Sequence, residues 1–388
     1  MLVTSHSPLV LTLAAICTLA TAYSAAAQPT LKRLDAVAAD GTVSVPLTNG
    51  RGIVTTDVPV TVHTENGTLY AVRWTDPPDK HAIATGVGGT TVAARGEQVL
   101  VAYVALREEA IHARVSADGG VTWSEPASLG PRPAGPALPT ACLYASDGAL
   151  RQVVAWSAQP SESDGPLVVA QHDGRDWQRT EHPSIRSSGP ALQCADDAPP
   201  EIVWRDHRDG LGPRVALYHA FIDPDGGLPG EHRVLMPAFD PSVCATPDAR
   251  YVGYHGATND AHLARSRDGG VTYADVDLDP GTPALDLLDD SGKFVSVACD
   301  GPVVAATWGD WPTKSDAAGR TPTRMLGMRV STDGGQSWIS LRPAGDDQDQ
   351  GPATVAVAGE RVLVMWKAPG TIRLAEFTLA PDPATAGQ

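Results

Sequence analysis

The sequence predicts an all-β protein, a β-propeller in which four-stranded antiparallel blades surround a central axis. Glycine (38) and proline (33) are frequent among the 388 residues and long amphipathic helical patterns are absent, which favours many short strands joined by turns. A short apolar run that ends in an aromatic residue recurs along the chain, and an eight-residue turn phrase occurs three times. Repetition of this kind is typical of propellers, in which each blade is one repeat.

The apolar runs set the length of the repeating unit. They are LYAVRW (ending at Trp74), VLVAY (Tyr103), RQVVAW (Trp156), PEIVW (Trp204), RYVGY (Tyr254), VVAATW (Trp308) and RVLVMW (Trp366). From Tyr103 onward the aromatic residues are 53, 48, 50, 54 and 58 residues apart, whereas the first interval is only 29. Units of about 50 residues suit four-stranded blades. The seven runs favour seven blades, and six blades is the alternative because the first unit is short.

Each unit is expected to contain four strands. Upstream of most of the aromatic residues lies another short apolar strand, which Gly-Pro-Ala introduces at residues 135–137, 189–191 and 351–353. We therefore expect a first, inner strand, a second strand that ends in the aromatic residue, a third strand, and a fourth strand at the outer edge.

The N-terminal segment is expected to complete the last unit. That unit has strands near residues 354–357, 362–366 and 372–378 but no fourth strand, and an unpaired outer edge would invite association with other chains. Either Thr42–Leu47 or Gly52–Thr56 is therefore expected to pair with Ile372–Thr378 and close the ring. The predicted division of the chain is a signal peptide (1–27), an N-terminal segment with the closing strand (28–55), the propeller (56–380) and a flexible tail (381–388).

The turn phrase has the pattern S-x-D-G-G-x-[ST]-aromatic. It occupies Ser116–Trp123, Ser266–Tyr273 and Ser331–Trp338. Gly-Gly accepts the positive φ angles of a tight hairpin, and the aspartate side chain can cap the N–H groups of the turn. On the strand order above, the phrase connects the third and fourth strands of a unit.

This pattern resembles the Asp-box, or BNR repeat, of sialidase-like β-propellers. In that family the box is a structural fastener on the face opposite the active site, and sialidases have six blades. Active members carry a Phe/Tyr-Arg-Ile-Pro motif, whose arginine joins a triad that holds the substrate carboxylate. The nearest position here reads Asp57-Val58-Pro59-Val60, so the resemblance implies the fold but does not justify sialidase activity.

The N-terminus and the overall charge predict an exported protein. Leu9–Ala22 is apolar and Ala25-Ala26-Ala27 offers small residues for cleavage before Gln28, as in a secretory signal peptide. The periplasm or the extracellular space is the expected location, and a monomer without membrane insertion is expected after cleavage. The net charge of −16 argues against nucleic acid or an anionic membrane as a partner, and against simple electrostatic capture of an anionic glycan.

Four cysteines of the mature chain follow the blade period. Cys142, Cys194, Cys244 and Cys299 are 52, 50 and 55 residues apart. In an exported protein they can form the disulfides Cys142–Cys194 and Cys244–Cys299 between neighbouring inner strands. The alternative is that each is a small buried residue at a position where other units have valine. No zinc spacing or H-E-x-x-H motif is present, so neither a metal nor another cofactor is predicted.

The connections after the second strands are expected to hold the site. In propellers these connections share one face with those between blades, and the box turns lie on the opposite face. The candidate ligand-binding residues are Asp76, Arg107, Arg205, Arg208, His255, Asp310 and Trp311. The same connections carry Lys80, Glu108, Glu109, Glu162, Asp164, His207, Asp209, Asn259, Asp260, Lys314 and Lys367.

The densest group is Trp204–Asp209. Arg205 and Arg208 could clamp a carboxylate, Asp206 or Asp310 could act as a general acid, and Trp311 could stack on a sugar. The alternative is a solvated loop with local Arg–Asp pairs.

Two functions follow from these observations. The first is a non-catalytic exported propeller that binds a glycan or a protein through the loop face around its central channel. The second is an enzyme with a divergent active site, either a sialidase-like exo-glycosidase or a polysaccharide lyase. The missing arginine motif and the acidic charge favour the first.

Overall fold

The computed structural model describes residues 29–39, 43–44, 52–131, 138–158, 165–210, 215–256, 261–276, 292–310, 325–341, 343 and 353–379. These residues form β-strands and no α-helix. In this part of the chain there is accordingly no helix long and apolar enough to cross a membrane. The expected signal peptide (1–27) and tail (381–388) lie outside the described residues.

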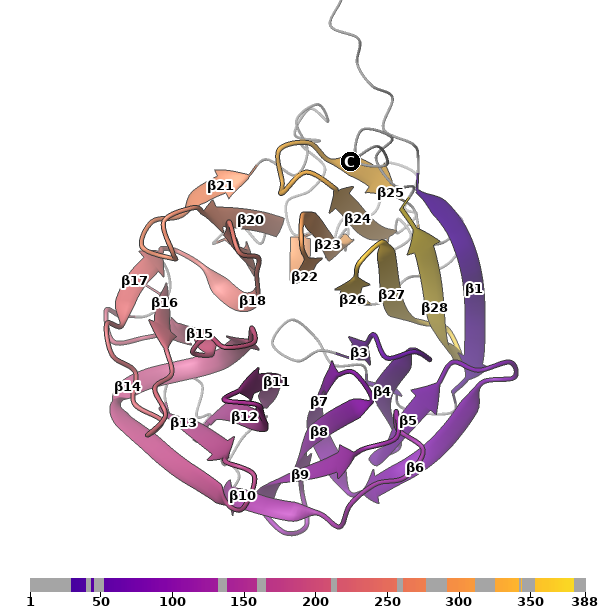
Figure 1. Ribbon diagram of the computed structural model, residues 1–388, viewed down its shortest axis with the longest axis horizontal. Coiled ribbons are helices and arrows are strands. Elements are labelled where there is room, and N and C mark those ends of the chain that lie inside the picture. Colours follow the sequence, from indigo (N-terminus) through magenta and orange to yellow (C-terminus); the bar gives the residue numbers. More distant parts are fainter. Residues whose placement is uncertain are drawn as a thin grey trace, which may run out of the picture.

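Small antiparallel sheets stand around a central axis in a propeller-like arrangement (Figure 1). The first sheet contains β2 (Val43–Ser44), β3 (Ile53–Val54), β4 (Val60–Glu65), β5 (Thr68–Arg73) and β6 (Asp79–Thr85). The second contains β7 (Val87–Arg95), β8 (Gln98–Ala105), β9 (Ala110–Ser116) and β10 (Ala127–Pro131).

The remaining sheets continue round the axis in chain order. A seven-stranded sheet contains β11 (Thr140–Ser146), β12 (Ala149–Ser157), β13 (Gly165–His172), β14 (Trp177–Gln193), β15 (Glu201–Asp206), β16 (Ala216–Phe221) and β17 (His232–Leu235). The next contains β18 (Phe239–Ala245), β19 (Arg250–His255), β20 (Ala261–Ser266) and β21 (Ala274–Val276). It is followed by β22 (Gly292–Asp300), β23 (Val303–Asp310), β24 (Met325–Ser331) and β25 (Ile339–Leu341). The last contains β26 (Ala353–Ala358), β27 (Arg361–Ala368), β28 (Thr371–Thr378) and β1 (Thr30–Ala38).

The long strand β14 belongs to two four-stranded groups. Its first part, Trp177–His182, pairs with β13 as an outer strand. Its last part pairs with β15 as an inner strand, from Ser187 to Gln193. The seven-stranded sheet is therefore composed of one group from β11 to β14 and a second from β14 to β17.

An N-terminal strand completes the last sheet. β1 pairs with β28 from Thr30↔Thr378 to Ala38↔Thr371. The expectation that an N-terminal segment pairs with Ile372–Thr378 is confirmed, but both segments named for it were wrong. β2 and β3 instead each pair with β4, on the side away from β5.

The first sheet corrects one strand assignment. LYAVRW lies in β5, which is a third strand, and Trp74 follows it. The second strand is β4, where His63 stands opposite Tyr70 just as Trp204 stands opposite Tyr218. His63 therefore takes the place of the recurrent aromatic residue, and the first interval becomes 40 residues.

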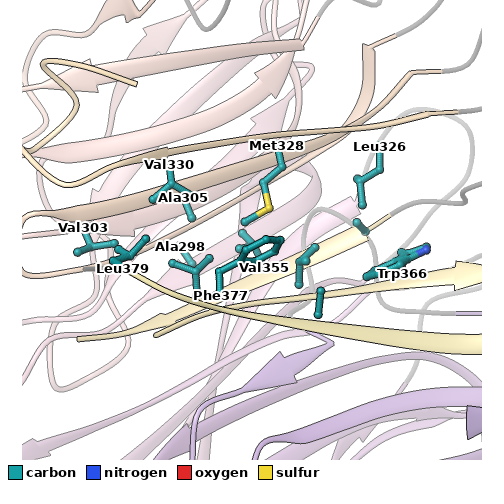
Figure 2. Close-up of a cluster of buried hydrophobic side chains, with 14 of the residues drawn as sticks. Ala298, Val303, Ala305, Leu326, Met328, Val330, Val355, Trp366, Phe377 and Leu379 are labelled. Atoms are coloured by element: carbon teal, nitrogen blue, oxygen red, sulfur yellow. The ribbon is translucent and has the colours of Figure 1, made fainter. Parts of the chain in front are cut away.

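The core lies between neighbouring sheets. One cluster joins Leu326 and Met328 of β24 to Trp366 of β27 and Phe377 of β28 (Figure 2). Trp366 is completely buried, as are Trp156 and Trp204 in other sheets. The recurrent aromatic residues thus fill the spaces between blades, and their burial stabilises the ring.

Both predicted disulfides are present. Cys142 pairs with Cys194, and Cys244 pairs with Cys299, each with a Cα–Cα distance of 5.8 Å. Each bond links the inner strand of one four-stranded group to the inner strand of the next, because Cys142 lies in β11, Cys194 directly follows β14, and the second pair joins β18 to β22.

The three turns of the pattern S-x-D-G-G-x-[ST]-aromatic, called box turns below, share one hydrogen-bond pattern. In the first, Ser116 Oγ accepts from Gly120 N (2.8 Å), and the Asp118 carboxylate accepts from Thr122 N (2.8 Å) and Thr122 Oγ1 (2.6 Å). Hydrogen bonds from Thr122, together with one from Ser116, lower the pKa of Asp118 to about 2. The other two boxes repeat these bonds.

The box turns fasten neighbouring sheets together. Arg73 Nε of the first sheet donates to Gly119 O (3.1 Å) in the second, and Arg265 Nη1 of β20 donates to Gly335 O (2.9 Å) in the turn after β24. The turn between β16 and β17 is a variant that the sequence pattern missed. There Asp223 Oδ1 takes the place of the serine hydroxyl and accepts from Asp225 N (3.1 Å) and Gly227 N (2.5 Å).

Candidate functional site

The candidate residues divide between the two ends of the ring. Arg107, Arg205 and His255 lie at or just after the ends of second strands, at the end of the ring away from the box turns. Asp76 does not join them. It lies between β5 and β6, a connection on the box side, since Arg73 at the end of β5 contacts Gly119. Asp76 was expected at the other end because LYAVRW was assigned as a second strand, whereas it lies in the third strand, β5.

Arg205 is the centre of a polar cluster formed by β14, β15 and β18. Its Nε donates to Ser188 Oγ (2.5 Å), and its Nη1 lies 3.5 Å from Asp240 Oδ1. His207 Nε2 lies 3.1 Å from the same serine oxygen. The Arg205 side chain is 26% exposed and that of Asp240 is 27% exposed, so ligand can reach both.

His255 joins this cluster from β19. Its ring stacks on Phe239 with a centroid distance of 5.2 Å, and its Nδ1 lies 3.7 Å from Asp240 Oδ2. The Arg205 guanidinium lies 5.9 Å from the Phe239 ring centroid. Asp240 has a φ of 46°, a left-handed backbone conformation that aspartate tolerates better than most residues. We call Ser188, Arg205, Phe239, Asp240 and His255 the Arg205 cluster.

Arg208 points to a different set of partners. Its Nη1 donates to Glu231 Oε1 (2.6 Å), its Nη2 donates to Asp206 Oδ2 (2.7 Å), and its guanidinium lies 4.4 Å from the Tyr218 ring. Burial lowers the pKa of Arg208, but the hydrogen bonds to Asp206 and Glu231 outweigh it and raise the pKa overall. Arg205 and Arg208 therefore do not form the predicted carboxylate clamp.

Asp206 is a structural anchor. It is completely buried and accepts hydrogen bonds from Trp204 Nε1 (2.9 Å) and from Arg208 N, Nε and Nη2 (2.7–2.9 Å). A general acid must reach the group that it protonates, and this carboxylate is enclosed by donors of its own chain. The geometry does not support the general-acid hypothesis for Asp206.

The same arrangement recurs in the first sheet. His63 Nε2 lies 2.7 Å from Glu65 Oε1, Lys80 Nζ donates to the same oxygen (2.5 Å), and Lys80 lies 4.3 Å from the Tyr70 ring. Burial lowers the pKa of His63 even though the bond to Glu65 opposes this. Sequence reasoning missed this group because it assigned β4 as an inner strand.

The other candidates contribute less. Arg107 is exposed and its side chain passes 3.5 Å from the position that a Cβ on Gly86 would occupy, and Glu108 lies 3.1 Å from His112. Glu109 is exposed, and Lys367 lies near the end of β27. Asp310 is the last residue of β23, and its side chain lies outside the described residues. Also outside them are Glu162, Asp164, Asn259, Asp260, Trp311 and Lys314.

The buried tyrosines are held in their neutral form. Burial, aided by a hydrogen bond to Asp209 (2.8 Å), raises the pKa of Tyr218 to about 12. Burial also raises the pKa of Tyr254, whose hydroxyl donates to Asp275 (2.6 Å). Neither hydroxyl is activated as a nucleophile. Across the described parts of the chain, no group of three histidine, cysteine, aspartate or glutamate side chains could hold a metal ion.

No protein-family model matches this chain, and no curated protein matches it. Among solved structures, a Trypanosoma rangeli sialidase in complex with the inhibitor DANA is similar at 14% identity and a TM-score of 0.45 over 78% of this chain. The match spans only 56% of the length of that sialidase.

Two similar structures are matched over almost their whole length. A Dyadobacter fermentans protein of unknown function matches at 16% identity and a TM-score of 0.47 over 76% of this chain and 95% of its own. A fucose-specific lectin from Aleuria aurantia matches at 12% identity and a TM-score of 0.47 over 76% of this chain and 96% of its own.

Proposed function

We propose that this chain is an exported, non-catalytic propeller that binds a glycan through the Arg205 cluster. The observation that carries the proposal is the meeting of a guanidinium, a carboxylate, an imidazole and a phenyl ring at one partly exposed place. Sugar sites combine an apolar surface with a few convergent polar groups, and this cluster has both.

The polar groups of the cluster retain hydrogen-bonding capacity. Arg205 has five N–H donors, of which Nε is bonded to Ser188 at short range. The two contacts of Asp240 are long, 3.5 Å to Arg205 and 3.7 Å to His255, so its oxygens can accept from ligand hydroxyls. Two adjacent hydroxyls of a sugar can bind here together, because one can accept from Arg205 while the other donates to Asp240.

The carboxylates favour binding over catalysis. Glycosidases of the common type need two carboxyl groups on either side of the bond that is cleaved. Asp206 is enclosed, and Asp240 is the one carboxylate that the described residues bring into the Arg205 cluster.

The proposed ring has seven blades. The group from β11 to β14 and the group from β14 to β17 count as two blades joined by one continuous strand, and β1 completes the blade of β26–β28. The hydrogen bonds of the three box turns support membership of the wider Asp-box superfamily, with a blade number that differs from the six of sialidases.

Two independent features support the proposal that the chain is exported. The N-terminal segment has the pattern of a signal peptide, and two disulfides suit an oxidising compartment. The proposed location is the periplasm or the extracellular space, and the proposed state is a monomer without membrane insertion.

A glycan array followed by titration of the strongest glycan tests the proposal. Arg205→Ala and Asp240→Asn should each weaken binding at least tenfold, whereas Arg175→Ala, an exposed arginine on the box side, should not change it. Fluorogenic sialosides should show no turnover. Turnover that Asp240→Asn abolishes would instead support the divergent enzyme.

A further inference from the structure

Two hollows at the box end of the ring share residue types in their linings, although these residues come from different positions in the strands. The first, of about 300 Å³, lies where the group β11–β14 meets the group β14–β17. We call it the Tyr144 hollow. The residues that line it include Tyr144, Asp147, Arg151, Gln178 and Asp225.

The second hollow, of about 470 Å³, lies where the sheet of β18–β21 meets that of β22–β25. We call it the Tyr251 hollow. Its lining includes Tyr251, Asp248, Arg267, Gln336 and Asp333. Both volumes fall within the range of about 300–1,000 Å³ that is typical of small-molecule sites.

The two linings share several chemical groups. Each has one tyrosine, one arginine, at least one glutamine, and one exposed aspartate from the turn between first and second strands, Asp147 or Asp248. The Tyr144 hollow also has Gln171, His172 and Asp173. Each also has the aspartate of a box turn. Asp333 occupies that place in the third Asp-box, and Asp225 occupies it in the variant turn of Asp223–Gly227.

Each hollow stands beside a disulfide that joins the same two groups of strands. Cys142 is two residues before Tyr144, and its bond to Cys194 links the inner strands on both sides of the Tyr144 hollow. Cys244 is two residues before Thr246 and Cys299 is two residues before Gly301, and both Thr246 and Gly301 line the Tyr251 hollow. The bonds hold these turns at a fixed separation, and such preorganisation favours binding.

The polar groups of the Tyr251 hollow are available to a ligand. Tyr251 is completely buried, and its hydroxyl has no hydrogen-bond partner among the described residues. Arg267 and Asp248 are exposed, and within the same residues neither forms a hydrogen bond or an ion pair. An unpaired buried hydroxyl is unfavourable, so a polar group that reaches it is favoured.

We propose that the Tyr144 and Tyr251 hollows each bind one neutral monosaccharide unit. Sugar hydroxyls both donate and accept, which suits an arginine donor, an aspartate acceptor and a glutamine amide. Aspartates outnumber arginines in both linings, and this surplus disfavours a carboxylate or phosphate ligand. These sites lie at the opposite end from the Arg205 cluster and do not depend on it.

Saturation-transfer NMR of the full chain with D-glucose, D-galactose, D-mannose, L-fucose and N-acetyl-D-glucosamine tests the proposal. At least one sugar should bind. With Arg205→Ala as the starting chain, so that the Arg205 cluster contributes no signal, Arg151→Ala and Arg267→Ala should each reduce the saturation signal by about half, and both together should abolish it. A reduction by about half is expected because Arg151→Ala and Arg267→Ala each remove one of two sites that contribute equally to the signal. Arg175→Ala, at an exposed arginine outside both linings, should leave it unchanged.

Two further variants guard against a folding defect. Asp147→Asn and Asp248→Asn change one exposed atom each and should reduce the signal in the same way, with an unchanged thermal unfolding temperature. The proposal is overturned if no sugar of the panel binds, or if binding survives when Arg151→Ala and Arg267→Ala are both added to Arg205→Ala. A signal that only Arg205→Ala removes would overturn it too, and would support the Arg205 cluster instead.

Discussion

At the scale of single residues, the structure separates charged groups that support the ring from those that remain available. Asp206 and Glu65 are both buried carboxylates. Asp206 contacts the ring nitrogen of Trp204 and Arg208, which lies over Tyr218. Glu65 contacts the ring nitrogen of His63 and Lys80, which lies over Tyr70. The partly exposed Arg205 and Asp240 make one short and two long contacts. The first kind of group is needed for stability, and the second kind can meet a ligand.

Removal of Asp206 should destabilise the protein strongly. Asp206→Ala leaves the Arg208 guanidinium and the Trp204 N–H without their acceptor, and breaking a buried ion pair costs about 3–5 kcal/mol. Urea unfolding measures this cost. Asp248→Ala, at an exposed aspartate, should change the free energy of unfolding by less than about 0.5 kcal/mol. Equal effects of the two substitutions would show that Asp206 is not an anchor.

At the scale of elements, the box turns act through close packing. Gly269 and Gly270 both have positive φ angles, +79° and +93°. A Cβ on Gly270 would lie 2.8 Å from His219 Cε1, whereas a Cβ on Gly269 would have nothing within 4 Å. A comparison of alanine substitutions at these two glycines therefore separates the cost of the left-handed backbone from the cost of the contact with the neighbouring sheet.

Gly270→Ala should therefore destabilise the protein more than Gly269→Ala. Both substitutions carry the left-handed backbone cost of roughly 1–2 kcal/mol. Gly270→Ala adds an overpacking cost of about 1–3 kcal/mol, because His219 must move. Thermal unfolding of both variants measures the difference, and a larger loss for Gly269→Ala would contradict the fastener role.

The box carboxylates should also make stability depend on pH. The folded pKa of Asp118 is lowered to about 2 from its ordinary 3.8, so its contribution is complete above 3.8 and is lost as the pH falls toward 2. Asp118→Asn should lower the unfolding temperature at neutral pH, and the gap from the unmodified protein should narrow across that range. A gap that stays constant down to pH 2 would exclude a role for the ionised carboxylate.

At the scale of the whole molecule, closure of the ring depends on β1. This strand covers the edge of β28 along its length, from Thr371 to Thr378. Deletion of residues 1–39 should expose that edge, lower the unfolding temperature and cause aggregation. A chain that lacks only residues 1–28 keeps β1 and is the control. Size-exclusion chromatography with light scattering would show the difference, and equal behaviour of the two chains would contradict the closing role.

Much of this architecture could be predicted from the sequence because it repeats. The spacing of aromatic residues located six of the second strands, and the cysteine spacing indicated both disulfides. The first unit was misread because His63 replaces the aromatic residue and Trp74 follows a third strand. β1 was missed because its sequence, TLKRLDAVA, is charged and not an apolar run.

The candidate site was harder to predict, since neighbouring residues in the sequence point in different directions. Arg205 contacts Ser188 and Asp240, whereas Arg208, three residues later, contacts Asp206 and Glu231. Phe239 and Asp240 carried no signal of their own, because only the packing of β18, in the next sheet, against β14 brings them to Arg205.

The central claim is that the Arg205 cluster binds a glycan without cleaving it. Isothermal titration of the strongest array glycan against the unmodified chain, Arg205→Ala and Arg175→Ala tests this most directly. The account predicts at least tenfold weaker binding for Arg205→Ala, unchanged binding for Arg175→Ala, and an intact glycan after the titration. Equal affinity of all three chains, or a cleaved glycan, would contradict it.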